Sequence, residues 1–235
     1  MNELLCTICA RGGSKGVKNK NIRKIANLEL IAYSIIQAQN SGLFKHIVIS
    51  TDSDEIASVA QKYGGEVFFK RSAKLATDRA AKVPVMRDAL LRSEKHFGCK
   101  FETLIDLDAT APLRTSKDII KAYELFCKEK AENLITATPS RKNPYFNMIE
   151  FQNGILAKVK KSVFKARQEA PICYDMNASI YIFQRGRLLQ SDELFGDKTS
   201  LYVMSEDTAF DIDSELDFEL VQFLLEKRAF KKEEF

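Results

Sequence analysis

Histidine and cysteine are scarce in this chain, and their spacing disfavours the usual transition-metal sites. The 235 residues include two histidines, His46 and His96, and neither has a His or Cys neighbour at ligand spacing, so we expect no zinc site. The five cysteines are scattered and odd in number, which argues against a disulfide framework. Cys6 and Cys9 form a Cys-x-x-Cys motif, but residues three apart in a strand point to opposite faces, so we predict no redox or metal role for the pair.

Long hydrophobic runs are also missing. No apolar stretch approaches the length of a membrane span, and residues 4–10 are too short and lack the basic lead-in of a signal peptide, so we expect no membrane association and a cytoplasmic location. With 45% hydrophobic and 29% charged residues, the chain has the composition of a globular protein, long enough for one substantial α/β domain but not for two. The net charge of +4 is modest and the features of a nucleic-acid reader are absent, so no nucleic-acid partner is predicted.

Acidic residues are absent between Glu3 and Glu29, and the loop inside this stretch is strongly basic. Residues 9–21 read CARGGSKGVKNKN and follow an apolar segment, 4–8, that has the length and β-branched content of a buried strand. The loop should therefore lie at the carboxyl end of a strand, where open α/β sheets bind ligands. Glycines let backbone N–H groups approach a polyphosphate, and the lysines and arginine offset its charge. The sequence thus predicts a phosphate-binding loop.

Strand-like and helix-like segments alternate through the first half of the chain, which predicts a mainly parallel sheet covered by helices on both faces. The predicted strands are 4–8, 46–50, 66–69, 103–108 and 134–138, and the predicted helices are 31–39, 54–63, 83–97 and one that Ser116 caps and that runs to residue 127.

The pattern changes after Pro139. Two apolar segments flank Asn153-Gly154, a strong hairpin signal, and we interpret residues 139–176 as a β-rich excursion from the main sheet. A strand at 178–183, a short strand at 201–204 and a final helix at 217–225 are predicted to follow. We therefore expect a single domain over residues 1–228 and a frayed tail over residues 229–235.

Two carboxylates stand two residues apart near the end of the chain, at Asp211 and Asp213. In an extended segment both would point to the same side. Paired carboxylates facing a polyphosphate are a common way to hold Mg²⁺. Alternatively, Asp213 caps the last helix, with further acids in its first turn. The basic glycine loop in the same chain favours the Mg²⁺ interpretation.

The glycine loop matches neither the P-loop nor the Gly-x-Gly-x-x-Gly pattern. Its order, Ala-Arg-Gly-Gly-Ser-Lys-Gly followed by Lys-Asn-Lys-Asn, instead resembles the signature of the sugar cytidylyltransferases that activate sialic acids, in which this loop wraps the triphosphate of CTP. The Asp-x-Asp near the C-terminus resembles that family too. Further similar segments lie at 69–78, 108–114, 167–168 and 177–182, so the resemblance runs from residue 5 to residue 217.

The resemblance implies a three-layer α/β/α nucleotidyltransferase (Rossmann-like) domain that forms a homodimer, in which the excursion reaches the partner's site. The implied reaction is CTP plus a nonulosonic acid giving the CMP-sugar and pyrophosphate, with Mg²⁺ as cofactor, for surface or flagellar glycans. The implied nucleotide-binding residues are Ala10, Arg11, Gly12, Gly13, Ser14, Asn21 and Arg71. The implied sugar-binding residues are Asp108, Arg167, Gln168, Asn177 and Tyr181. The implied catalytic residues are Arg11, Lys15, Lys20 and Asp211, and the implied metal ligands are Asp211 and Asp213.

Several positions depart from the family's pattern. The family's Pro before Ala-Arg is Cys9, its sugar-contacting Gln is Asp108, the following Pro is Ala109, and the Gly after Asn is Ala178. An ionised carboxylate accepts hydrogen bonds and cannot donate them, so Asp108 suggests a sugar with a different substitution pattern. The variant most resembles the branch that activates legionaminic acid, with N,N'-diacetyllegionaminic acid as the best candidate.

Other functions stay open at this point. The sugar could be N-acetylneuraminic acid, or the protein could be another sugar nucleotidyltransferase such as the octulosonate cytidylyltransferase, whose loop typically lacks the Lys-Asn-Lys-Asn extension. A nucleotide-binding module without catalytic activity is less favoured, because the loop cations and the Asp-x-Asp motif are all present.

Overall fold

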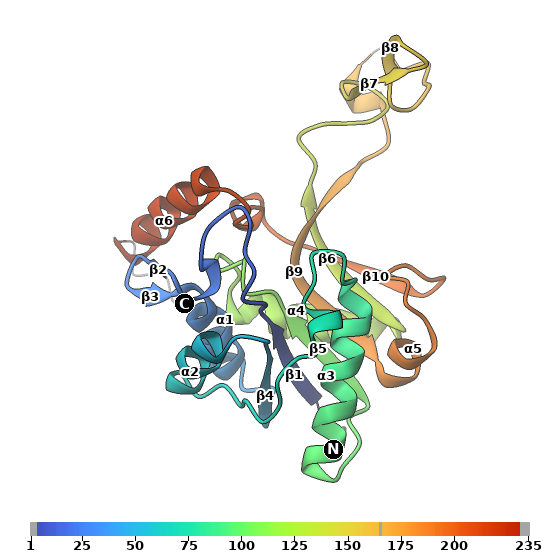
Figure 1. The fold of residues 1–235 in the computed structure, drawn as a ribbon. Helices are drawn as coiled ribbons and strands as arrows, with labels where there is room; N and C mark the ends of the chain where they lie inside the picture. The colour runs from blue at the N-terminus through green and yellow to red at the C-terminus, as the bar shows by residue number, and fades with distance from the viewer. Residues whose placement is uncertain (1–3, 165, 231–235) are drawn as a thin grey trace.

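The computed structural model describes residues 4–164 and 166–230, and a twisted sheet forms its centre. The strands of this sheet are β1 (Leu4–Cys9), β4 (His46–Ser50), β5 (Thr103–Leu107), β6 (Asn133–Pro139), β9 (Tyr174–Gln184) and β10 (Thr199–Val203). Their order across the sheet is β10-β6-β9-β5-β1-β4 (Figure 1). Among the described strands of this central sheet, β9 is the one that runs antiparallel to its neighbours, β5 and β6. The sheet is therefore mainly parallel, as predicted.

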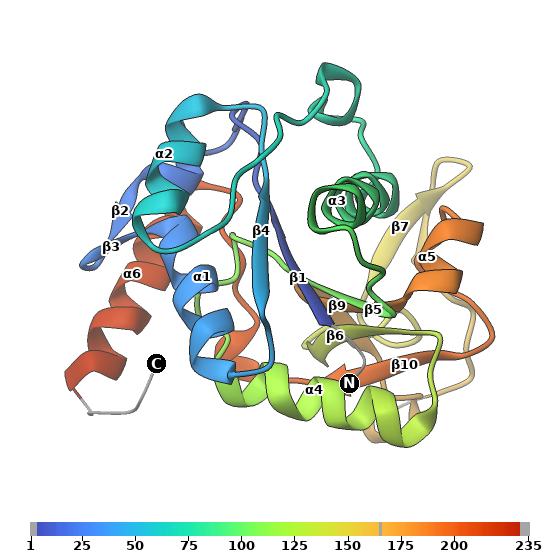
Figure 2. The same ribbon diagram turned by 90° about the horizontal axis from the view of Figure 1, so that it is seen from below.

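Helices cover both faces of the sheet (Figure 2). They are α1 (Leu30–Ser41), α2 (Asp54–Lys62), α3 (Lys82–Phe97), α4 (Ser116–Glu129), α5 (Arg185–Gln190) and α6 (Glu215–Phe230). Alternate residues of β1 face opposite layers: Cys6 and Ile8 pack with α1, α2 and α4, whereas Leu5 packs with α3 and α5. Every residue of β5 is buried, as expected of a strand covered on both faces. The predicted three-layer α/β/α fold is confirmed.

A third apolar cluster attaches the glycine loop and α6 to this body. Val17 lies within the loop, Ile212 precedes α6, and both are fully buried in one cluster with Phe218. The short strands β2 (Lys24–Ile25) and β3 (Leu28–Glu29) form a small ladder beside them. Single turns of 3-10 helix occur at η1 (Lys20–Ile22), η2 (Ala73–Leu75), η3 (Arg167–Glu169) and η4 (Glu206–Thr208). Core packing therefore holds the glycine loop next to the segment that precedes α6.

The excursion stands away from the three-layer body (Figure 1). Its hairpin consists of β7 (Ile149–Gln152) and β8 (Ile155–Lys158). The two residues between these strands, Asn153 and Gly154, have φ angles of 51° and 81°, the positive values that a tight two-residue hairpin turn requires. The predicted hairpin is confirmed.

Several predicted elements differ from the structure. The strand predicted at 178–183 is longer, since β9 runs from Tyr174 to Gln184, so the predicted excursion ends earlier than residue 176. The strand at 66–69 is wrong, because Glu66 makes one isolated bridge to Val48 and the chain then leaves the sheet so that Phe68 and Phe69 pack on the α3 side. Ser116 is not the cap of α4. Thr115 is the cap, since its hydroxyl accepts from the backbone N–H three residues on.

The last helix is longer than the predicted 217–225, since α6 runs from Glu215 to Phe230. Residues 229 and 230 of the predicted tail are therefore helical, and residues 231–235 lie outside the described part of the chain. In that described part, none of the helices has both the length and the apolar character needed to cross a membrane.

Candidate active site

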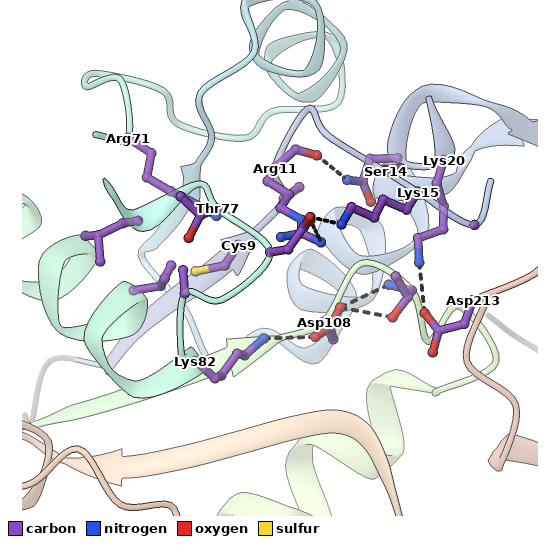
Figure 3. A pocket seen from close by; sticks show the side chains of 18 residues that line it. Cys9, Arg11, Ser14, Lys15, Lys20, Arg71, Thr77, Lys82, Asp108 and Asp213 are labelled. Atoms are coloured by element: carbon purple, nitrogen blue, oxygen red, sulfur yellow. Dashed lines mark hydrogen bonds and ion pairs between the residues drawn. The ribbon is translucent and has the colours of Figure 1, made fainter. Parts of the chain in front are cut away.

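A cavity of about 390 Å³ opens where β1 and β5 end (Figure 3). The glycine loop forms one wall, the segment between η2 and α3 forms a second, and Asp108 and Asp213 complete it. Of the residues predicted from the sequence, the cavity lining includes Ala10, Arg11, Ser14, Lys15, Lys20, Asn21, Arg71, Asp108 and Asp213. Gly12, Gly13, Asp211, Arg167, Gln168, Asn177 and Tyr181 are outside this lining.

The glycine loop is held in shape by hydrogen bonds and by close packing. The side-chain amide of the buried Asn21 donates to the Arg11 carbonyl at 3.0 Å, and the Gly12 N–H donates to Asp52 Oδ1 at 2.8 Å. Gly16 lies against the segment before α6, where a Cβ atom would stand 1.8 Å from the Asp213 carbonyl oxygen. Only glycine fits this position without displacing the backbone.

Two loop cations share one carboxylate. Arg11 Nη2 lies 2.9 Å from Asp78 Oδ1, and Lys15 Nζ pairs with the other oxygen, Asp78 Oδ2. The hydrogen bond from Lys15 lowers the pKa of Asp78. Our reading of the sequence did not include Asp78 among the site residues, although it ends the Leu-Ala-Thr-Asp segment that resembles the cytidylyltransferases.

Lys20 connects the loop to the acidic segment. Its ammonium lies 3.2 Å from Asp213 Oδ1 and also donates to the Ile212 carbonyl. Figure 3 shows Lys20 directed at Asp213 from the opposite wall. Ile212 is buried in the core, whereas Asp211 is half-buried and Asp213 is exposed.

Asp213 does not cap the last helix. The Ser214 hydroxyl accepts from the Asp217 N–H at 3.2 Å, and Asp217 Oδ2 accepts from the Ser214 N–H at 2.8 Å. This reciprocal capping box satisfies the helix terminus. The alternative interpretation of Asp213 as the cap is therefore wrong, and its carboxylate is available to the cavity.

Asp211 and Asp213 suit a hard cation that also binds the substrate. Burial, followed by the neighbouring charges of Asp213 and Asp108, raises the pKa of Asp211. Within the residues that the structure describes, no three His, Cys, Asp or Glu side chains are grouped to hold a metal ion. A cation held by the two carboxylates would therefore need further oxygen ligands, which phosphate groups supply.

Asp108 is paired with a lysine that the sequence analysis missed. Lys82 Nζ lies 2.9 Å from Asp108 Oδ2 and 2.6 Å from Asp106 Oδ1, and it stands 4.9 Å above the ring of Tyr181. The second oxygen of Asp108 accepts from the backbone and hydroxyl of Thr110 at 3.2 and 3.1 Å. Burial opposes ionisation, but Lys82 and Thr110 outweigh it and lower the pKa of Asp108.

A signal for this cluster existed in the sequence. Lys82 is the first residue of α3, where the positive end of the helix dipole disfavours a cation, so it requires an acidic partner nearby. Asp106 lies in the middle of an apolar strand and is completely buried, which demands the same. Lys82 and Asp106 prove to be each other's partners only when the structure places α3 beside β5.

The predicted sugar-binding residues other than Asp108 are not at the cavity in this chain. Asn177 is buried, and its side chain accepts from Thr136 Oγ1 at 2.8 Å. Tyr181 lies beneath Lys82 with 6% of its surface exposed. Arg167 and Gln168 lie on the returning branch of the excursion, where Arg167 donates to the Ser140 carbonyl at 3.2 Å.

Arg71 and Cys9 lie at the inner end of the cavity. The Arg71 guanidinium is buried and donates through Nε to Ser50 Oγ at 3.0 Å, at the end of β4. Burial raises the pKa of the Cys9 thiol well above its ordinary range, so this side chain stays neutral. Cys6 points into the opposite layer and is completely buried, as expected for residues three apart in a strand.

Comparison with known proteins gives three findings. A family model described as Cytidylyltransferase matches residues 5–234. Over the full length of both chains, the sequence is 70% identical to a Campylobacter jejuni subsp. jejuni protein named CMP-N,N'-diacetyllegionaminic acid synthase and 68% identical to post-translational flagellin modification protein B of Campylobacter coli. The solved structure of CMP:2-keto-3-deoxy-manno-octonic acid synthetase complexed with CTP has a TM-score of 0.72 at 13% identity, covers 96% of this chain and 99% of its own, and supports the fold.

Proposed function

The chain belongs to the cytidylyltransferase family, and we propose that it activates a nonulosonic acid with CTP, forming the CMP-sugar and releasing pyrophosphate. The observation that carries this proposal is the convergence of Arg11, Lys15 and Lys20 with Asp213 around one cavity at the carboxyl ends of parallel strands. We propose N,N'-diacetyllegionaminic acid as the sugar, because the Campylobacter jejuni relative with that substrate in its name is 70% identical over the whole chain.

In the proposed reaction, the anomeric hydroxyl of the sugar attacks the α-phosphorus of CTP in line, and pyrophosphate leaves on the opposite side. One P–O bond forms to the sugar and one P–O bond to pyrophosphate breaks. Arg11 and Lys15 stand on the loop wall and would offset the charge on the departing pyrophosphate. Lys20 would do the same nearer the Asp-x-Asp segment. Asp211 and a water molecule are our two candidates for the group that takes the hydroxyl proton.

We propose that Asp211 and Asp213 hold Mg²⁺ together with phosphate oxygens. The carboxylates of Asp211 and Asp213, two residues apart, provide the oxygen ligands that this ion prefers. When bound, Mg²⁺ would neutralise charge on the phosphate groups. Lys20, which pairs with Asp213, would then turn to the phosphates.

We also propose that the protein is a homodimer that works in the cytoplasm, where its nucleotide substrate is made. The exposed apolar side chains of the hairpin support the dimer, since large apolar patches mark contact surfaces. They include Ile149, Phe151, Ile155 and Leu156, which are 62%, 77%, 73% and 56% exposed. If this hairpin docked on a partner subunit, Arg167 and Gln168 of the same excursion would come close to the partner's cavity. The family resemblance implies this role for them.

The direct test mixes the protein with CTP, Mg²⁺ and one sugar at a time, and measures pyrophosphate and CMP-sugar. The panel contains N,N'-diacetyllegionaminic acid, N-acetylneuraminic acid and the octulosonate. We expect the highest kcat/KM with the legionaminic acid, and a roughly 10²–10³-fold loss of turnover for Lys20→Ala. Absence of CMP-sugar with every member of the panel would contradict the proposal.

The metal assignment has a separate test. Asp211→Asn and Asp213→Asn should each raise the Mg²⁺ concentration needed for half-maximal rate. Asp217→Asn serves as the matched control, because Asp217 belongs to the capping box of α6 and lies outside the cavity lining. Equal Mg²⁺ dependence in all three variants would remove Asp211 and Asp213 from the metal site.

A further inference from the structure

Asp78 lines the cavity and pairs with two of its cations, Arg11 and Lys15. Its two carboxylate oxygens contact two different cations, Oδ1 with Arg11 Nη2 at 2.9 Å and Oδ2 with Lys15 Nζ. This bridging contact is the one that two oxygens of a phosphate group would make. Arg11 and Lys15 are also the loop cations to which we assign the leaving pyrophosphate, so both anions need the same partners.

A phosphate group can replace Asp78 at Arg11 and Lys15 with a small loss of free energy. Asp78 is 41% exposed and Lys15 is 79% exposed, so each group returns to water when the pair opens. An exposed ion pair changes an equilibrium by roughly 1.4- to fivefold, so the two pairs together change it by roughly 2- to 25-fold. Asp78 also lies between η2 and Lys82, on a short segment whose two ends are fixed, because Arg71 is bonded to Ser50 and Lys82 to Asp108. Release of Asp78 is therefore a local movement.

We propose that Asp78 is an internal competitor for the phosphate groups, which lowers the affinity of the enzyme for pyrophosphate and so promotes its release. The inference rests on the proposed function, since it takes Arg11 and Lys15 as the pyrophosphate site. A triphosphate or pyrophosphate carries more negative charge than one carboxylate and displaces it from both cations. CMP carries only the α-phosphate, the group that stays on the CMP-sugar. It lacks the two phosphates that we assign to Arg11 and Lys15.

Asp78 thereby determines which anions the loop retains. With the carboxylate present, the cations are neutralised whenever the site is empty, and weakly charged anions gain little by entering. After the reaction, the same carboxylate returns to Arg11 and Lys15 as pyrophosphate leaves. Without it, two unpaired cations would hold pyrophosphate more tightly and slow the next turnover.

The test is an equilibrium binding measurement on the full chain with pyrophosphate, CTP and CMP as probes, at fixed ionic strength and Mg²⁺. We expect Asp78→Asn to bind pyrophosphate roughly 2- to 25-fold more tightly than the wild type, to bind CTP more tightly as well, and to bind CMP with unchanged affinity. Asp78→Glu keeps the charge and should stay within about threefold of the wild type. Asp88→Asn is the matched control, because Asp88 pairs with Arg92 on the surface of α3 and is not part of the cavity.

Each other result has a defined meaning. Unchanged pyrophosphate affinity in Asp78→Asn would overturn the inference, and weaker affinity would do so as well, because it would show that Asp78 positions the two cations for the ligand. A wild-type protein that binds neither CTP nor pyrophosphate would overturn the proposed function and this inference with it. Thermal melting of each variant verifies that the chain is folded.

Discussion

Lys82 and Asp108 form an ion pair of 2.9 Å at the inner wall of the cavity, and the same ammonium lies 2.6 Å from the buried Asp106. One lysine therefore balances two carboxylates that would otherwise repel each other at low dielectric. The family that the sequence resembles has a neutral glutamine in place of Asp108. In this chain the neutral side chain is replaced by an acid whose charge is compensated from a neighbouring helix.

Lys82→Met should destabilise the protein strongly, by about 3 kcal/mol, because it leaves the buried Asp106 and the half-buried Asp108 without their cation. The double variant Lys82→Met/Asp108→Asn removes one of the two carboxylate charges and should recover part of this loss. Urea unfolding of the two variants and the wild type measures the difference. Equal free energies of unfolding for the single and the double variant would show that the Asp108 charge is not destabilising in the absence of Lys82.

Asp108→Gln should shift sugar preference from N,N'-diacetyllegionaminic acid towards N-acetylneuraminic acid. Gln donates a hydrogen bond that Asp cannot, and an unpaired buried polar group costs about 1–3 kcal/mol. The measurement is the ratio of kcat/KM for the two sugars. Asp108→Asn is the control, since it removes the charge without the longer reach of Gln. An unchanged ratio in Asp108→Gln, with activity retained, would mean that Asp108 does not read the sugar.

Gly16→Ala should lower kcat/KM by about 10²-fold, because its Cβ would stand 1.8 Å from the Asp213 carbonyl oxygen and would push the loop from the acidic segment. Gly13→Ala is the control in the same loop, since a Cβ there meets nothing within 4 Å. We expect Gly13→Ala to stay within a few-fold of the wild type. Similar losses in both variants would show that loop flexibility, and not the contact with Asp213, is responsible.

Ala178→Gly should stabilise the protein by about 0.5–1 kcal/mol. Ala178 has a φ of 45°, where a Cβ is strained and glycine is not. It lies where the pairing of β6 with β9 shifts register, beside the Thr136 hydroxyl that accepts from the Ile180 N–H at 3.0 Å. Ala137→Gly in the neighbouring β6 should instead destabilise, because its φ is not positive and glycine only adds unfolded-state entropy. Chemical denaturation of both variants distinguishes strain from a general effect of glycine.

Glu94→Gln should reduce stability by about 1–2 kcal/mol at pH 7 and by progressively less in acid. Arg185 Nε and Nη2 bind the Glu94 carboxylate at 2.7 and 3.0 Å, and the Phe101 N–H donates to it at 3.2 Å. Burial alone would raise the pKa of Glu94, but these hydrogen bonds outweigh it and lower the pKa.

The sign of the pH effect follows from this lowered pKa. The ionised carboxylate stabilises the fold above the unfolded pKa of about 4.3, and the contribution is lost as the pH falls through the lower folded pKa. Unfolding free energies of wild type and Glu94→Gln should therefore converge below pH 4. Asp88→Asn, which removes an exposed i,i+4 pair, should change stability by less than about 0.5 kcal/mol at any pH. A constant difference between wild type and Glu94→Gln would contradict the prediction.

Local sequence patterns were sufficient for most of the architecture. The apolar run before the glycine loop forms β1, the periodic segment after it forms α1, and Asn153-Gly154 forms the predicted turn. These features depend on side-chain periodicity and backbone conformation over a few residues. The strand predicted at 66–69 failed for the complementary reason, because Phe68 and Phe69 pack against residues of a helix that comes later in the chain.

The sequence by itself predicted a phosphate-binding loop and a metal-binding Asp-x-Asp pair, because each depends on residues that are neighbours in the chain, and the resemblance to the cytidylyltransferases predicted the class of reaction. Only the tertiary structure decided which charges meet. Lys20 pairs with Asp213, which is 193 residues away in the chain. Lys82 of α3 pairs with Asp106 in β5 and with Asp108 just after it. Asp78 pairs with Arg11 and Lys15 of the loop. Such pairs form when segments far apart in the sequence pack together in the fold. The periodicity of the sequence does not encode which charged side chains then become neighbours.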